Sequence, residues 1–198
     1  MKINCRIGVM PGPWPPGPNG AEFLSFPTIV GAAAHGAIPH HQPTDYVIQK
    51  GDPVVIDMGV MVDGYCSDLT RTIVCGGKAS DPDFQRVYDI VLVAQRTAEE
   101  LIKAGMTGDE GHMLAHNVIA EAGYGENFGH GLGHGVGLQV HEAPRLARTA
   151  KDLLEDGMIV TVEPGIYLTG RFGVRIEDQC VIENGKVRAM SRAPKLMA

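Results

Sequence analysis

Two aspartates, Asp57 and Asp68, lie in apolar segments on either side of a predicted hairpin turn. A two-residue turn at Asp63-Gly64 places Asp57 opposite Thr70. Opposed residues share a face and side chains alternate along each strand, so both aspartates point to one side as diagonal neighbours, about 7–8 Å apart at the backbone. Buried like charges are costly unless one carboxyl protonates or a cation neutralises them. The alternative is a half-exposed sheet with both carboxylates at the surface.

A glycine-rich segment, GHGLGHGVGLQVHE at residues 129–142, carries three histidines, His130, His134 and His141. Alternating glycines cannot hold a stable helix, so the segment is not a helical zinc-binding pair of histidines. The glycine spacing also does not fit a nucleotide-binding loop. Glycines that expose the backbone around histidines favour a site that another group approaches closely, for metal binding or proton transfer. The alternative for each histidine is an ordinary structural role.

Two glutamates, Glu163 and Glu177, also lie in apolar, strand-like segments. Arg175 shares the strand parity of Glu177, so a plain Arg175–Glu177 salt bridge is the alternative for that pair. Together the aspartates, a histidine and the glutamates form a carboxylate-rich ligand set, which suits Mn²⁺, Fe²⁺, Co²⁺ or Zn²⁺. Five such ligands could hold two ions that share a bridging water and polarise a carbonyl, which is hydrolytic chemistry.

The elements that position these residues alternate between strands and helices. Asp81 with Pro82 predicts a helix start, Gly105 its end, and Thr107 with Glu110 a capping box for a second helix that ends at Gly123. A hairpin, two helices and then a β-rich third favour an α+β fold over a doubly wound sheet. We expect strands at residues 29–30, 53–62, 65–74, 158–168 and 173–182, and a short strand after Asn184-Gly185.

Composition limits the class of protein. The 198 residues carry 23 acidic and 17 basic side chains, a formal charge of −6, so the sequence predicts neither a nucleic-acid nor a membrane partner. No apolar stretch approaches the roughly 20 residues of a membrane span. Residues 1–10 do not resemble a secretion signal, and the four cysteines form no C-x-x-C pair. We expect a cytoplasmic protein with a flexible Pro/Gly-rich lead-in at residues 1–22 and one domain at 23–198.

In this order, the five candidate ligands resemble the pattern of the pita-bread metallopeptidases, a superfamily that includes methionine aminopeptidases, aminopeptidase P and prolidase. The carrying motifs are IDMG, SDLTRT, GHGLGHGVGLQVHEAPR, VEPGIY and RIED. The resemblance implies an α+β pita-bread fold, a curved antiparallel sheet covered by helices. The family's catalytic domain normally begins with two helices before the FPTIV strand, where this chain has its proline-rich lead-in, so the first helices are expected to be missing.

The resemblance implies a role for each matching residue. Two divalent ions, Mn²⁺ being favoured, would be held by Asp57, Asp68, His134, Glu163 and Glu177. Asp68 and Glu177 would bridge the ions, and Glu163 would also accept a proton from the bridging water. Substrate-side roles are implied for His40, His141, His130 and Arg175. Of these, His40 and His141 are the predicted catalytic histidines, and His130 and Arg175 the predicted substrate-binding residues.

The RIED and HGVGLQVHEAPR motifs resemble aminopeptidase P and prolidase more than methionine aminopeptidase. This favours cleavage of an Xaa-Pro bond in a peptide or dipeptide, and it leaves a homodimer open. Two rival interpretations are a pita-bread binding module without activity and a non-peptidase enzyme on the same scaffold. The intact ligand set disfavours the first rival and a creatinase-like form of the second.

Overall fold

The computed structural model describes residues 20–42 and 44–195. Most of the predicted 1–22 lead-in therefore lies outside the described residues. In chain order the elements are β1 (Phe23–Leu24), β2 (Ile29–Ala32), η1 (Ala33–Ala37), β3 (Pro53–Met58), β4 (Val60–Val62), β5 (Tyr65–Cys66), β6 (Leu69–Val74), α1 (Phe84–Leu101), α2 (Gly108–Glu121), η2 (Gly125–Asn127), β7 (Gly133–Gly135), β8 (Glu142–Leu146), β9 (Ile159–Val162), β10 (Gly165–Leu168), β11 (Phe172–Arg175), β12 (Asp178–Glu183) and β13 (Lys186–Ala189).

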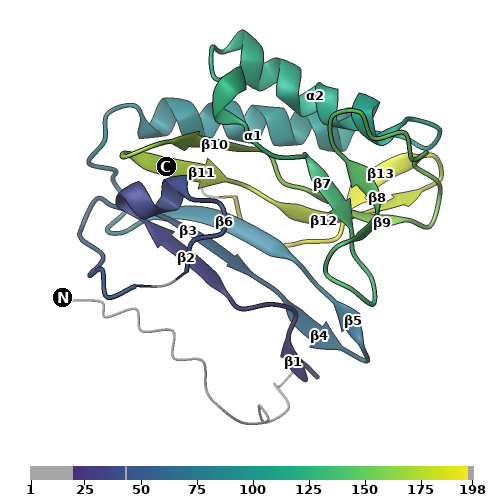
Figure 1. The fold of residues 1–198 in the computed structure, drawn as a ribbon, viewed down its shortest axis with the longest axis horizontal. Helices are drawn as coiled ribbons and strands as arrows, with labels where there is room; N and C mark the ends of the chain where they lie inside the picture. The colour runs from purple at the N-terminus through teal and green to yellow at the C-terminus, as the bar shows by residue number, and fades with distance from the viewer. Residues whose placement is uncertain (1–19, 43, 196–198) are drawn as a thin grey trace.

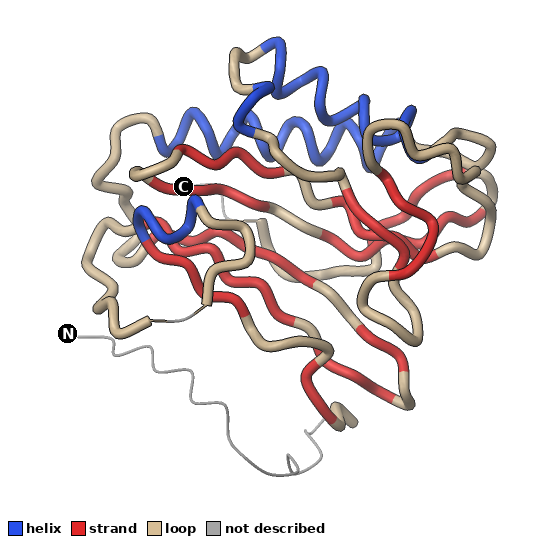
Figure 2. Tube along the Cα trace, viewed as in Figure 1, coloured by secondary structure: helices blue, strands red, loops and turns tan. Residues whose placement is uncertain are grey.

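The strands form antiparallel sheets, with α1 and α2 together on one side of them (Figures 1 and 2). Strands β13-β12-β9-β7-β8 make the largest sheet, and β2-β3-β6, β1-β4-β5 and β10-β11 make the smaller ones. This arrangement confirms the predicted α+β class. Residues 20–28, the only described residues before β2, contain no helix, and among the described residues no helix is long and apolar enough to cross a membrane.

The hairpin register is as predicted. Val62 pairs with Tyr65 in β4–β5, and Asp57 pairs with Thr70 in β3–β6. The turn residue Asp63 has φ of +50°, in the left-handed region that a two-residue hairpin turn requires. Each predicted strand is nevertheless interrupted, with breaks at residue 59 and at residues 67–68.

The first helix is displaced at its start. It begins at Phe84 with Asp83 as its N-cap, two residues beyond the predicted Asp81–Pro82 start. Asp81 instead accepts hydrogen bonds from the Asp83 amide and from Arg171, which hold it in the preceding turn. The apolar face of α1 is buried up to residue 98, although Leu101 is half exposed. Helix α2 packs against α1. It begins with the predicted capping box between Thr107 and Glu110.

The predicted strand at residues 158–168 is two strands, β9 and β10, which belong to different sheets. The predicted strand at 173–182 is likewise divided into β11 and β12. The breaks fall at Glu163-Pro164 and at Ile176-Glu177, so both glutamates lie between strands and not within them. Proline cannot donate to a ladder, which explains the first break.

The glycines of β7 have a different role from the one predicted. A Cβ on Gly133 would lie 2.0 Å from the Thr161 carbonyl oxygen, and one on Gly135 would lie 2.1 Å from that of Ala143. The space beside these two glycines is therefore occupied by neighbouring backbone of the same chain and not by a ligand. Without these glycines β7 could not lie between β8 and β9, and His134, which is in β7, would be displaced.

Candidate metal centre

Three of the five predicted ligands offer atoms to a common point. One ligand atom each from Asp68, His134 and Glu177 lies within 4.8 Å of the other two. Asp68 comes from the break between β5 and β6, His134 from β7, and Glu177 from the break between β11 and β12. The chain therefore brings together residues more than 100 positions apart, two of them at strand breaks where side chains are not bound by the alternation of a regular strand.

The two remaining predicted ligands adjoin this group. Glu163 Oε1 lies 3.2 Å from His134 Nε2, which is itself 3.7 Å from Asp68 Oδ2. Asp57 faces Asp68 closely enough that each carboxyl affects the pKa of the other. Asp57 and Asp68 are only 8% and 6% exposed, so the alternative of two surface aspartates is wrong.

Each aspartate and Glu177 leaves one buried oxygen without a hydrogen-bond partner among the described residues, namely Asp57 Oδ1, Asp68 Oδ1 and Glu177 Oε1. Their other oxygens are partly satisfied, since Arg175 Nη2 donates to Asp57 Oδ2 at 2.6 Å and Thr70 Oγ1 donates to Glu177 Oε2 at 2.6 Å. Buried carboxylate oxygens without partners are costly. Oxygen atoms that converge with one imidazole match the donor set that Mn²⁺, Fe²⁺, Co²⁺ and Zn²⁺ accept, so the residues fit a divalent metal site.

The carboxylates of the ligand cluster repel one another. Burial, followed by the charges of Asp57 and Glu163, raises the pKa of Asp68 to about 8. Burial, with the neighbouring carboxylates adding to it, raises the pKa of Glu177 well above its ordinary value. Protons or cations must therefore neutralise these carboxylates near neutral pH.

Glu163 differs from the other carboxylates. Burial alone would raise the pKa of Glu163, but His134, His130 and Arg175 outweigh it and hold that pKa below its ordinary value. Thr161 Oγ1 also donates to Glu163 Oε1 at 3.0 Å. Glu163 therefore stays ionised and can accept a proton.

His134 is oriented by its own backbone neighbour. Its Nδ1 lies 3.1 Å from the Gly135 carbonyl oxygen, to which it donates. In the neutral ring this leaves the lone pair on Nε2, which faces Asp68 and Glu163. A histidine held in this way is suited to bind a metal ion through Nε2.

The candidate ligands line a cavity of about 800 Å³ whose wall also includes His40, His130, His141 and Arg175. His40 follows η1, and His141 lies between β7 and β8; both are exposed at the cavity. The rings of His141 and His134 are in contact, with centroids 4.3 Å apart. Burial, followed by the charge of His134, lowers the pKa of His141, so the ring is neutral at pH 7 and can donate a hydrogen bond to a substrate oxygen.

Arg175 is a buried member of the cavity wall that binds one of the carboxylates. Its guanidinium is 3% exposed and donates to Asp57, to Tyr167 Oη at 3.0 Å and, through Nε, to Thr70 Oγ1 at 3.1 Å. The alternative of an Arg175–Glu177 salt bridge is wrong, because the strand breaks between the two residues and Arg175 turns to Asp57. These bonds favour a role in holding Asp57 over direct substrate contact.

His130 also uses both ring nitrogens within the protein. Nδ1 lies 2.7 Å from the Gly131 carbonyl oxygen, and Nε2 lies 2.8 Å from Tyr167 Oη. Tyr167 therefore connects His130 to Arg175. Sequence reasoning did not identify Tyr167, although the residue lies in the quoted VEPGIY motif.

Sequence reasoning also assigned no role to Thr70 or Arg145. Thr70 could have been found, because the predicted register places it opposite Asp57. Arg145 pairs with His134 in the β7–β8 ladder, and opposed residues share a face. Arg145 is exposed and lines the cavity, and it forms no ion pair with another described residue.

Comparison with known proteins identifies the family. The chain is 48% identical over 171 residues to an Xaa-Pro dipeptidase of Pyrococcus horikoshii. This match covers 86% of this chain and 48% of the dipeptidase. A structure titled Xaa-Pro dipeptidase from Bacillus anthracis superposes with a TM-score of 0.87 at 46% identity, covering 90% of this chain and 50% of the other. An X-Pro aminopeptidase from Thermotoga maritima superposes with a TM-score of 0.85 at 41% identity, covering 89% and 49%.

These similarities confirm the pita-bread fold and the resemblance to the prolidase and aminopeptidase P branch. The chain spans about half the length of the curated relatives it matches. The family model described as metallopeptidase family M24 matches residues 17–184, the span that contains every candidate ligand. The chain therefore belongs to metallopeptidase family M24.

Proposed function

We propose that this chain hydrolyses the Xaa-Pro bond of a dipeptide at a site for two divalent metal ions. The observation that carries the proposal is the convergence of Asp68, His134 and Glu177, with buried carboxylate oxygens that have no partner among the described residues. Asp57 and Glu163 would complete the ligand set. Bound divalent ions would polarise the scissile carbonyl and lower the pKa of the attacking water.

The chain's own residues supply the proton transfers and the orientation. Glu163, which stays ionised, would accept the proton of the attacking water and pass it toward the departing amine. His40 and His141, both exposed in the cavity wall, would donate hydrogen bonds to the substrate amide and to the developing oxyanion. His130 and Arg175 would keep Tyr167 and Asp57 in place.

Two observations favour a dipeptidase over an aminopeptidase. The relatives with the highest identities reported above are named Xaa-Pro dipeptidases. In addition, Arg145 presents an exposed guanidinium to the cavity on the face that carries His134. A dipeptide has its free carboxylate one residue beyond the scissile bond, where a guanidinium can bind it with two hydrogen bonds. A longer peptide has a neutral amide at that position.

Several finer points remain predictions. Mn²⁺ is the favoured metal. Co²⁺, Zn²⁺ and Fe²⁺ are alternatives, because they accept the same ligand set and metal availability decides among them. A cytoplasmic location and a homodimer are likewise predictions from the sequence.

The test is hydrolysis by the purified 198-residue chain with added Mn²⁺. We expect cleavage of Ala-Pro, slower cleavage of a longer Xaa-Pro peptide, and no cleavage of Ala-Ala. Equal rates on Ala-Pro and Ala-Ala would contradict proline specificity. Metal binding without any cleavage would instead favour the rival interpretations of a binding module or a non-peptidase enzyme.

A further inference from the structure

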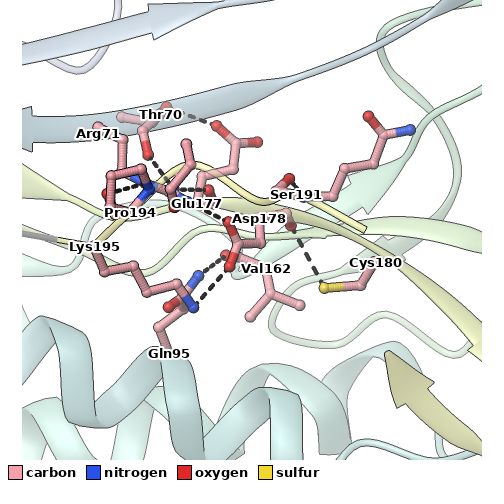
Figure 3. A network of polar contacts seen from close by, with 12 residues as sticks. Thr70, Arg71, Gln95, Val162, Glu177, Asp178, Cys180, Ser191, Pro194 and Lys195 are labelled. Atoms are coloured by element: carbon pink, nitrogen blue, oxygen red, sulfur yellow. Dashed lines mark hydrogen bonds and ion pairs between the residues drawn. The ribbon is translucent and has the colours of Figure 1, made fainter. Parts of the chain in front are cut away.

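Residues 190–195, which follow β13 and are here called the strap, pass beside a network of charged side chains (Figure 3). The strap begins with two bonds to β12: Met190 N donates to Gln179 O at 2.8 Å, and Gln179 N donates to Ser191 Oγ at 3.0 Å. The side-chain oxygen of Gln179 accepts from the Asp68 amide at 3.2 Å. The strap therefore reaches one candidate ligand through a single intervening residue.

The strap also binds Arg71 of β6. Arg71 Nη2 donates to the Ala193 carbonyl oxygen at 2.8 Å and to Asp178 Oδ1 at 2.6 Å, and Nε donates to the Pro194 carbonyl oxygen at 3.3 Å. Through Nη1 the same guanidinium donates to the Glu177 carbonyl oxygen. Arg71 thus connects the strap to the backbone of a second candidate ligand.

This connection matters because Glu177 lies in the break between β11 and β12. A residue in a strand interior is fixed by ladder hydrogen bonds, but the backbone of Glu177 is held by Thr70, to which its amide donates at 3.1 Å, and by Arg71. Contacts from Thr70 and Arg71, outside its own strand, therefore keep the Glu177 backbone in position.

Lys195 completes the network. Its Nζ lies 2.7 Å from Asp178 Oδ2 and 3.0 Å from Glu99 Oε2 on α1, and all three side chains are less than 20% exposed. Two cations, Arg71 and Lys195, therefore balance two carboxylates. Without Lys195, Glu99 would lose its one ion-pair partner among the described residues, in a largely buried setting where an uncompensated charge is costly.

We propose that the strap positions the metal-binding carboxylates, with Lys195 and Arg71 as positioning residues for Glu177 and Asp68. The proposal rests on the proposed function, because it requires that these carboxylates bind metal. Neither Lys195 nor Arg71 lines the cavity, so both act through Asp178, Gln179 and the Glu177 backbone. The strap therefore controls metal affinity without touching the substrate.

The test compares Lys195→Met with Lys151→Met in the full 198-residue chain. Both variants lose one lysine charge and keep an unbranched side chain, but Lys151 is exposed and forms no ion pair with another described residue. Mn²⁺ affinity is measured by titration calorimetry after chelator treatment. We expect Lys195→Met to weaken Mn²⁺ binding about 10-fold or more, the usual effect of losing a group that supports a ligand. Lys151→Met should match the wild type.

Two further readouts separate positioning from general stability. Lys195→Arg should restore most of the Mn²⁺ affinity, and at saturating Mn²⁺ the KM of Lys195→Met for Ala-Pro should stay within about twofold of wild type. If Lys195→Met does not fold, Ser191→Ala removes only the hydroxyl that binds Gln179, and it should weaken Mn²⁺ binding in the same direction.

The outcomes are distinguishable. Wild-type Mn²⁺ affinity in a folded Lys195→Met, or in Ser191→Ala where Lys195→Met does not fold, would refute the strap proposal and leave the proposed function intact. Failure of the wild type itself to bind Mn²⁺ would refute both proposals.

Discussion

Replacing Asp68 by Asn should stabilise the metal-free chain in a pH-dependent manner. The carboxyl of Asp68 has a pKa of about 8 in the folded chain, raised first by burial and then by Asp57 and Glu163, against about 3.9 when unfolded. The folded chain holds this proton at pH 7 and the unfolded chain does not. The stability that depends on it is fully present below about pH 3.9 and is lost as pH rises toward 8.

The size of the effect follows from these values. Between pH 4.5 and pH 7 the wild type should lose about 3 kcal/mol that Asp68→Asn keeps, at roughly 1.36 kcal/mol per pKa unit. An amide resembles a protonated carboxyl in shape and charge, so the native geometry should persist. In a chain of this size such a difference corresponds to a melting-temperature shift on the order of 10 °C.

The assay is urea unfolding of chelator-treated protein at pH 4.5 and pH 7, with the exposed Asp45→Asn as the control. Adding Mn²⁺ at pH 7 should make the wild type the more stable of the two, since it gains stability by binding metal and Asp68→Asn, which lacks one of the proposed ligand carboxylates, should not. Hydrolysis should be abolished in Asp68→Asn. A stability gap between wild type and Asp68→Asn that is the same at both pH values would refute the argument that the ligand cluster is strained by buried charge.

Three other predictions concern residues around the site. His141→Ala should lower kcat while metal content by elemental analysis stays unchanged; loss of metal would show that His141 is a ligand. Arg145→Gln should raise the KM for Ala-Pro at least several-fold but leave that for Ala-Pro amide unchanged, and equal effects would contradict carboxylate recognition. Burial, with the charges of His116 and Arg148, lowers the pKa of His112 to about 4. Between pH 7.5 and pH 5 the unfolded chain therefore takes up a proton at this histidine that the folded chain does not, and the wild type should lose about 2 kcal/mol of unfolding free energy. His112→Asn, which keeps a hydrogen-bond acceptor, should lose less unfolding free energy over the same pH range, as measured by urea unfolding. Equal losses in the wild type and in His112→Asn would contradict this cause.

The features that the sequence predicted correctly depend on local chemistry. The Asp63-Gly64 turn determines the hairpin register, and the register alone places Asp57 opposite Thr70. The capping box at Thr107 likewise depends on two residues three positions apart. The ligand motifs were recognisable because each consists of a few adjacent residues.

The features that it missed depend on contacts between distant segments. Strand breaks at Glu163 and Glu177 follow from membership in different sheets, which strand periodicity does not reveal. Arg175 binds Asp57, which is 118 positions away, and not the nearby Glu177. The glycines of β7 were read as room for a ligand, but they make room for adjacent strands, which only the sheet order shows.

The central claim is that the ligand cluster holds two divalent ions and that these ions support Xaa-Pro hydrolysis. The most direct measurement is metal stoichiometry by elemental analysis of the folded, Mn²⁺-loaded chain, followed by its rate on Ala-Pro. We predict close to two ions per chain, and loss of both ions and activity after chelation. A well-folded chain that binds no divalent metal, or that cleaves Ala-Pro equally well after complete metal removal, would contradict the account.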